Sequence, residues 1–351
     1  MTVYTAEGAK AFIKQAFLAA GAAETKAAVM ADTLVYASLR GVDSHGISRT
    51  GAYLKRVETG IVDKDAEPRI VAESSAGALL DAGNTFGQYA SVKAVELVCE
   101  KAAAAGVAMV AVANSNHFGS AGYYVQKIAE RGMIGVCGAN STKAMVLWGA
   151  AKPFLGTNPL AYAVPAGKYD PLILDMATSV VARGKIRRAL DSGTSIPPDW
   201  AVGPDGKRTT DPAEAYKGYV LPFGGPKGSA IALFVEILSG VITGAAVGPE
   251  VGSMYSDFDK PQGLGHFFIA VDPARFIGRE AFAARMESLV ESVKALPASE
   301  PGGQVFLPGE IERGNEKKRR AEGIPVPPDV EKSLAAVAQK YGLALPENVG
   351  V

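Results

Sequence analysis

The segment GVDSHGISRT, residues 41–50, holds two side chains suited to proton transfer and anion binding. His45 is one of only three histidines in the 351 residues, and Arg49 follows it by four positions. If residues 44–60 form a helix, these side chains lie one turn apart on one face. An arginine can hold a carboxylate through two parallel hydrogen bonds, and a histidine can donate a proton to a carbonyl oxygen. The pair therefore suits 2-oxo acid chemistry, the alternative being local packing with Ser44 as a helix cap.

Three further polar segments follow predicted strands. NSNHFGSAGYY (114–124) places His117 before Gly119 and Ser120, whose backbone N–H groups at a helix start suit an anion such as a phosphate. The alternative is a capped turn with a solvated histidine. GANSTKAM (138–145) ends in small polar groups, and LILDMATS (172–179) places Asp175 at a strand end. Open α/β sheets bind ligands beyond the carboxyl ends of their strands, so these segments indicate a binding edge.

A fourth segment, LPFGGPKGSAIALFVEIL (221–238), surrounds Lys227 with glycines directly before a long apolar run. Glycines permit close backbone approach, and a lysine beside a helix start suits a phosphate or carboxylate. A flexible loop with a surface lysine is the alternative. The apolar run approaches membrane length, but Glu236, Ser239 and Gly240 interrupt it. We expect a helix buried inside an α/β core.

Composition and missing motifs exclude several classes of protein. The chain has 36 basic and 36 acidic residues, so its charge favours neither a nucleic-acid nor a membrane partner. Neither the Rossmann glycine fingerprint nor a P-loop occurs. The three histidines lie far apart, so no metal site is predicted. Cys99 and Cys137 lie in apolar segments and are expected to be buried thiols, and the N-terminus lacks a signal-peptide pattern. These features predict a cytoplasmic protein.

The spacing of apolar residues along the sequence changes near residue 68. The first 60 residues have the apolar spacing of helices, and beyond them short apolar runs alternate with helical stretches, which is typical of an α/β fold. The charged, then proline-rich segment 310–328 is predicted to be an exposed arm that wraps on a partner subunit or returns to the helical part. We therefore expect a helical domain, residues 1–70 joined by 310–351, and a cofactor-binding, catalytic α/β domain, residues 71–309.

Taken together, several long segments resemble one family. VDSHGISR, NHFGSAGYY, GTNPLAYAVP, LDMATSVVARGKI, GGPKGSAIALFVEILSGVITGA and GHFFIAVDP are similar to the malate/L-lactate dehydrogenase type 2 family, in order, over residues 3 to 345. That family includes L-sulfolactate, ureidoglycolate and diketogulonate enzymes and reductases of cyclic imino acids. The resemblance implies a sulfolactate dehydrogenase-like, non-Rossmann NAD(P)-binding sheet domain with a helical N-terminal domain. It also implies a homodimer or higher homo-oligomer with active sites near the subunit interface.

The resemblance also implies roles for individual residues. Ser44, His45 and Arg49 match the family's SHG…R motif, in which the histidine donates the proton in some members and the arginine contacts the substrate carboxylate. His117 matches the acid–base histidine of other members; both are kept, with His45 favoured. The family's cofactor contacts, with NAD or NADP, fall on His117, Phe118, Gly119, Ser120, Ala121, Ser141, Asp175, Met176, Ala177, Lys227, Gly228, Leu307, Pro308, Gly309 and Glu310.

The predicted function is an NAD(P)-dependent oxidoreductase that interconverts a small 2-oxo acid and its 2-hydroxy acid. The alternative within enzymes reduces cyclic imino acids. Lys185 stands where some imine reductases are expected to have an acidic residue, which mildly disfavours imine reduction. The segment GGPKGSA is instead more similar to the imine and sulfolactate branches than to malate enzymes. The substrate therefore stays open. Arg187 and Arg188 could attract the 2′-phosphate of NADP or form a solvated helix face. A non-enzymatic binding protein on the same fold would be expected to lack one of the polar site residues. All of them are present: Ser44, His45, Arg49, His117, Asp175 and Lys227.

Overall fold

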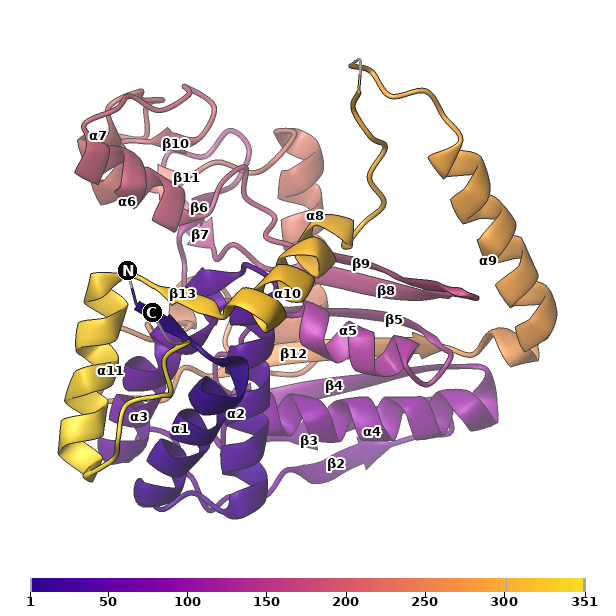
Figure 1. The fold of residues 1–351 in the computed structure, drawn as a ribbon, viewed down its shortest axis with the longest axis horizontal. Coiled ribbons are helices and arrows are strands. Elements are labelled where there is room, and N and C mark those ends of the chain that lie inside the picture. Colours follow the sequence, from indigo (N-terminus) through magenta and orange to yellow (C-terminus); the bar gives the residue numbers. More distant parts are fainter. Residues whose placement is uncertain (1, 301, 350–351) are drawn as a thin grey trace.

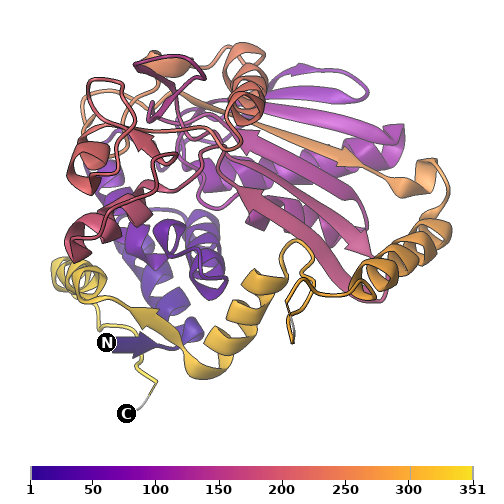
Figure 2. The same cartoon turned by 90° about the horizontal axis from the view of Figure 1, so that it is seen from above.

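Helices and strands alternate along the chain and build one central sheet flanked by helices (Figures 1 and 2). The structure, a computed structural model, describes residues 2–300 and 302–349. The helices are α1 (Ala6–Ala19), α2 (Glu24–Leu39), α3 (Thr50–Glu58), α4 (Gly87–Ala105), α5 (Gly122–Ala129), α6 (Arg183–Ser192), α7 (Pro212–Lys217), α8 (Pro226–Glu236), α9 (Arg279–Lys294), α10 (Glu310–Glu322) and α11 (Pro328–Tyr341). The strands are β1 (Thr2–Tyr4), β2 (Arg69–Glu73), β3 (Gly77–Asp81), β4 (Val107–Ser115), β5 (Ile134–Ala139), β6 (Met145–Val146), β7 (Pro153–Leu155), β8 (Leu160–Ala166), β9 (Tyr169–Met176), β10 (Ala201–Val202), β11 (Tyr219–Val220), β12 (Leu264–Val271) and β13 (Ile324–Val326).

The central sheet has the strand order β2-β3-β4-β12-β5-β8-β9. Only β3 and β4 pair in parallel, and every other neighbouring pair is antiparallel. Because β12 separates β4 from β5, and β8 separates β5 from β9, the strands β4, β5 and β9 run in one direction. Their carboxyl ends therefore lie at one edge of the sheet, where the polar segments after residues 115, 139 and 176 come together.

Burial explains why the central strands read as nearly continuous apolar runs. β4 and β12 are buried, with α4 and the turn after α8 packed against both strands, while α5 covers β5, β8 and β9. Buried strands need apolar residues at both odd and even positions. β2, at the edge, is exposed along its whole length.

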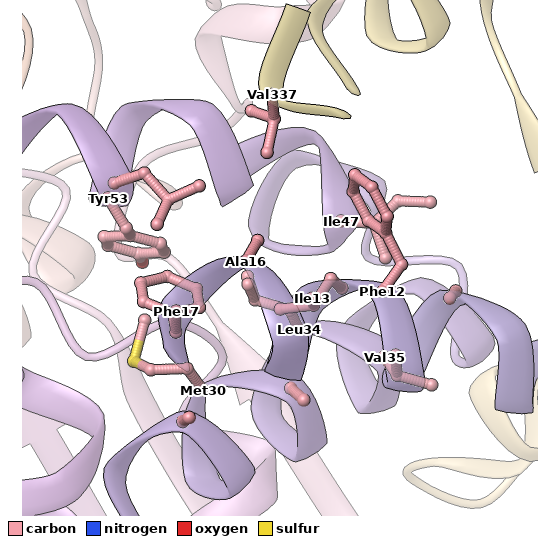
Figure 3. Close-up of a cluster of buried hydrophobic side chains, with 14 of the residues drawn as sticks. Phe12, Ile13, Ala16, Phe17, Met30, Leu34, Val35, Ile47, Tyr53 and Val337 are labelled. Atoms are coloured by element: carbon pink, nitrogen blue, oxygen red, sulfur yellow. The ribbon is translucent and has the colours of Figure 1, made fainter. Parts of the chain in front are cut away.

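The N-terminal helices form a second core with the end of the chain. Phe12, Phe17 and Leu34, from α1 and α2, pack with Val337 of α11 (Figure 3). β13 pairs antiparallel with β1, so residues 324–326 lie beside residues 2–4. The segment 310–328 thus returns to the helical part, one of the two predicted paths. The first part of the segment is exposed as predicted, since none of the residues of α10 is buried, and i,i+4 pairs such as Glu316–Arg320, 2.7 Å apart, support this helix.

A small third unit was not predicted inside residues 71–309. The four-stranded sheet β10-β11-β6-β7 packs with α6 and α7 around a cluster of its own, which includes Met145, Leu155 and Ile186. Its strands are two or three residues long, so they carry too little periodicity to be recognised in the sequence. The division into a helical and a cofactor-binding domain stays a prediction.

Helix α8 corrects the expectation of a helix buried on all sides. It continues into a π-helical turn, Ile237–Val241. Ala232 and Val235 are fully buried, whereas Phe234 and Val241 are more than half exposed. Small residues and the hydrogen-bonded Glu236 are buried, whereas large apolar residues face outward, the reverse of the usual amphipathic pattern. No helix in the described ranges is long and apolar enough to cross a membrane.

Candidate active site

The opening motif folds as two short turns rather than as the start of a helix. Asp43–His45 and Ile47–Arg49 are separate 3₁₀ turns, and α3 begins only at Thr50. The extended Gly46 separates them, packed so closely that a Cβ there would lie 2.0 Å from the Ser38 hydroxyl oxygen. The helix predicted over residues 44–60 therefore forms only from Thr50 to Glu58, and the expected start with Ser44 as its cap is wrong.

The two turns nevertheless bring Ser44, His45 and Arg49 together. The Ser44 hydroxyl lies 2.9 Å from His45 Nδ1, and Arg49 Nε donates to the Ser44 carbonyl at 2.5 Å. Desolvation by the surrounding protein, and then the Arg49 charge, lower the pKa of His45 to about 4. His45 is thus neutral near neutral pH, with its Nδ1 facing an exposed hydroxyl.

Arg49 lies close enough to His45 and His117 for its charge to lower the pKa of both rings. Its guanidinium lies 5.2 Å from the centre of the Tyr255 ring, a cation–π arrangement. In the described part of the chain its two terminal nitrogens have no hydrogen-bond partner, since only Nε is engaged. The outer edge of the guanidinium therefore keeps the two parallel donors that a carboxylate needs.

His117 follows β4 and is held from several sides. Its Nδ1 lies 2.6 Å from the Tyr53 hydroxyl and accepts the Gly119 backbone N–H at 3.2 Å. Its own backbone N–H donates to Gln262 at 3.1 Å. Burial lowers the pKa of His117 well below its ordinary value, as do the positive charges that His45, Arg49 and His266 can carry. His117 is therefore a neutral imidazole.

The two predicted catalytic histidines share one cavity. Their rings stack with centroids 5.3 Å apart and planes inclined by 21°. The cavity, of about 200 Å³, is lined by side chains from the opening motif and from the ends of β4, β5 and β9. The lining residues are Val42, Ser44, His45, His117, Phe118, Gly119, Ser120, Ala121, Ala139, Asn140, Ser141, Thr157, Pro159, Asp175, Ala177, Ala182, Leu264 and His266.

Asp175 ties two of these strand ends together. Its Oδ2 accepts from the Ser120 hydroxyl at 2.6 Å and from the Gly122 N–H at 2.8 Å. Solvent reaches the carboxylate through the cavity, but the protein walls around it raise its pKa, against the lowering effect of these hydrogen bonds. Only Oδ2 has partners in the described residues, so Oδ1 remains an acceptor toward the cavity.

Several lining residues were not singled out from the sequence. His266, at the start of β12, is fully buried, stacks on Phe118 at 4.7 Å and lies 2.8 Å from the Ser115 hydroxyl. Burial lowers its pKa to about 3. Asn140 is held by the Gly265 N–H and the Ala246 carbonyl. The GHFF and GAN segments were recognised as strands, but their pairing across 125 residues or more is not visible in the sequence.

Other predicted cofactor residues lie outside this cavity. Lys227 and Gly228 begin α8, where Lys227 is exposed. Leu307, Pro308 and Glu310 border a second cavity of about 130 Å³ beside β9, and Glu310 pairs with Lys294 at 2.8 Å. Gly309 lies against Ile173 of that strand. Met176 is half-buried beside Ala177 and does not line the wall. The assignment of these residues to cofactor binding stays a prediction.

The two remaining sequence features concern charge and metals. Arg187 pairs with Asp191 at 2.9 Å, and both Arg187 and Arg188 are exposed, which fits a solvated helix face. Among residues 2–300 and 302–349, no group of three or more histidine, cysteine or acidic side chains is placed to hold a metal ion.

Comparison with known proteins decides the family. The malate/L-lactate dehydrogenase model matches residues 4–335. The chain belongs to this family. It is 40% identical over 329 residues, 94% of each protein, to L-sulfolactate dehydrogenase of Methanocaldococcus jannaschii. It is 34% identical over 323 residues, 92% of each, to a Δ1-pyrroline-2-carboxylate/Δ1-piperideine-2-carboxylate reductase of Pseudomonas putida.

The solved structures give the same result. Sulfolactate dehydrogenase from Methanocaldococcus jannaschii matches with a TM-score of 0.93 and 38% identity, covering 98% of each chain. The predicted sulfolactate dehydrogenase-like fold is confirmed. Membership in the family makes the chain a dehydrogenase-type oxidoreductase that acts on 2-hydroxy acids, as the sequence predicted.

Proposed function

We propose that the chain interconverts a small 2-oxo acid of the malate, lactate or sulfolactate type with its 2-hydroxy acid in the cavity between His45 and His117. The observation that carries this proposal is that two neutral imidazoles share one cavity, with Arg49 close enough for its charge to lower the pKa of both rings. In the reducing direction the carbonyl carbon gains a hydride and the carbonyl oxygen gains a proton. The protein must hold the carboxylate, polarise the carbonyl and supply that proton.

Arg49 binds the substrate carboxylate. Its Nε is occupied by the Ser44 carbonyl, which orients the planar guanidinium and leaves the terminal nitrogens for two parallel hydrogen bonds. The Tyr255 ring supports the guanidinium from one face. When the carboxylate binds, the positive charge of Arg49 is balanced, which removes the smaller of the two causes that lower the pKa of His45, burial being the larger.

His45 donates the proton, and His117 orients the carbonyl. As His45 Nε2 gives its proton to the carbonyl oxygen, Nδ1 takes a proton from solvent through the exposed Ser44 hydroxyl, so the neutral ring changes tautomer and no imidazolate forms. The Nδ1 of His117 faces protein donors instead and lacks such a path. A neutral His117 can offer its Nε2–H as a hydrogen-bond donor to the carbonyl oxygen.

The nicotinamide end of NAD or NADP would lie in the same cavity, and the cofactor would supply the hydride when bound. Asp175 Oδ1 is an acceptor suited to the amide of a nicotinamide ring, and Ser141 and Ala177 lie on the same wall. In the described chain, no carbonyl accepts from the backbone N–H groups of Ser120 or Ala121, which leaves them for a polar ligand. Apolar residues such as Pro159 and Leu264 bound the rest of the cavity and exclude water from the ring.

A second copy of the chain covers the outer face of α8. Phe234, Val241 and Ile242 are each more than half exposed, and Ile242 borders a hollow against β2 and β3, where Ile70 and Val71 are also exposed. An apolar face of this extent is typical of a subunit interface. Light scattering should give at least the dimer mass, and Phe234→Asp should reduce it.

A cytoplasmic location accompanies this proposal. Cys99 and Cys137 are free and buried, and burial raises both of their thiol pKa values. Buried protonated thiols suit a reducing compartment. Fractionation of the native host would test the location.

The decisive experiment is a substrate panel followed by the absorbance of NADH and NADPH in parallel. The panel contains oxaloacetate, pyruvate, sulfopyruvate, diketogulonate and Δ1-piperideine-2-carboxylate, with ureidoglycolate and NAD in the oxidative direction. Turnover of an open-chain oxo acid supports the proposal and identifies the branch. Turnover of the cyclic imine alone would overturn the proposed 2-oxo acid activity. It would favour the imine-reductase alternative, which is the activity named for the Pseudomonas relative.

A further inference from the structure

Tyr53 reaches His117 from a different part of the fold. Tyr53 lies on α3, where its ring packs beside Phe17 in the helical core (Figure 3). Its hydroxyl lies 2.6 Å from His117 Nδ1, across 64 residues of sequence. The side chain of Tyr53 is 5% exposed, so water does not replace this contact. The helical part of the chain thus contacts the His117 ring at Nδ1.

The direction of this hydrogen bond follows from a second donor. The Gly119 backbone N–H points at the same Nδ1 from 3.2 Å, and a backbone N–H can only donate. Nδ1 must therefore carry its lone pair, and the Tyr53 hydroxyl must donate to it. A neutral imidazole with a bare Nδ1 carries its proton on Nε2.

The state of Tyr53 agrees with this role. Burial raises the pKa of its hydroxyl, so the phenol stays protonated and remains a donor. A hydrogen bond to the unprotonated Nδ1 favours the neutral ring over the imidazolium. The charged or titratable groups that face His117 are His45, Arg49 and His266, and each of them disfavours a second proton on the ring.

We propose that Tyr53 is a positioning residue, whose hydroxyl fixes His117 in the Nε2–H tautomer and so presents a hydrogen-bond donor to the substrate carbonyl. The catalytic value of that donor rests on the proposed function, whereas the tautomer itself does not. Without the hydroxyl, His117 keeps only the longer Gly119 contact, and the other tautomer, which would aim a lone pair at the carbonyl oxygen, becomes accessible.

The test is the variant Tyr53→Phe, which lacks only the phenol hydroxyl. Tyr4→Phe is the matched control, because Tyr4 is also buried and its hydroxyl has no partner among the described residues. With nitrogen-15 histidine, the three histidines give three sets of ring signals, assigned with His45→Asn and His117→Asn. The shifts of Nδ1 and Nε2 report the tautomer of each ring.

We expect wild-type His117 to show the Nε2–H tautomer throughout the neutral range. Tyr53→Phe should mix the tautomers, raise the pH at which His117 titrates, and lower kcat about tenfold with little change in KM, since one buried hydrogen bond is lost. Tyr4→Phe should change none of these. A wild-type His117 in the Nδ1–H tautomer, or a Tyr53→Phe enzyme with an unchanged tautomer and kcat, would overturn the proposal.

The wild-type spectrum is recorded without substrate and without any variant. It therefore distinguishes a failure of the proposed function from a failure of the role of Tyr53. If the substrate panel shows no open-chain turnover while the tautomer is as expected, the proposed function fails and the role of Tyr53 in fixing the ring stands. If turnover occurs and the tautomer is the other one, the role of Tyr53 fails alone.

Discussion

The surroundings of His45 and His117 differ sharply although the two rings stack in one cavity. His45 lies on a short turn of the helical part, with its Nδ1 against an exposed hydroxyl. His117 lies at the sheet edge, with its Nδ1 against a buried phenol and a backbone N–H. Both rings are neutral, so we propose that access of Nδ1 to solvent divides their roles. In this proposal His45 can exchange a proton with solvent, whereas His117 is held in one tautomer.

The largest effect should come from removing each ring in turn. His45→Asn should lower kcat about a thousandfold because the proton donor is lost. His117→Asn should lower it only about tenfold, because the amide retains an N–H donor. Steady-state kcat with the preferred oxo acid measures both. Equal losses, or the reverse order, would remove the proposed division of roles.

Two substitutions of Arg49 distinguish the effect of its charge from the effect of its hydrogen-bond geometry. Arg49→Met should raise KM for the carboxylate substrate about a hundredfold, since two charge-assisted hydrogen bonds are lost, and should raise the pKa of His45 above its value of about 4. Arg49→Lys keeps the charge, so it should raise KM while the pKa of His45 stays low. NMR titration of His45 and KM measurements test both. An unchanged KM in both variants would exclude Arg49 from substrate binding.

His266 extends the comparison to a histidine with no access to solvent. Its pKa is about 3 in the folded protein, against about 6.5 in an unfolded chain, so only the unfolded chain gains a proton between these values. Its contribution to stability is therefore fully present above about pH 6.5 and is lost as the pH falls. It should lower the free energy of unfolding by about 2 kcal/mol between about pH 7 and pH 5.

Urea unfolding at several pH values measures this effect. The variant His266→Gln has its own baseline stability, so the slope against pH is the quantity to compare. Above about pH 5 the carboxylates titrate little, and the histidines dominate the slope. A variant with the wild-type slope would show that His266 is not the source.

Ser44 should give the smallest effect. If its hydroxyl returns protons to His45, Ser44→Ala should lower kcat about fivefold and leave KM unchanged, because Arg49 binds the Ser44 backbone carbonyl and not its side chain. Steady-state kinetics would show this. A rise in KM with constant kcat would instead place Ser44 in substrate binding.

Much of the fold was predictable because its signals are local. Apolar spacing predicted the helical first 60 residues, where α1 and α2 lie, and the alternation of short apolar runs with helical stretches predicted the α/β part, whereas α7 and α10 were not predicted as helices. The failures have local reasons too. Gly46 and its packing against Ser38 break the predicted helix, and α8 buries small and polar residues such as Glu236 while Phe234 faces outward.

The sequence by itself determined the family, the reaction class and the residue types of the site, because these depend on motifs that remain contiguous along the chain. Only the tertiary structure decided how those residues work together. Antiparallel pairing around β12 aligned three strand ends at one edge, and the return of α3 beside the sheet brought Tyr53 to His117. Such contacts join residues 64 or more positions apart. They arise from packing of the whole chain, on which a local pattern carries no information.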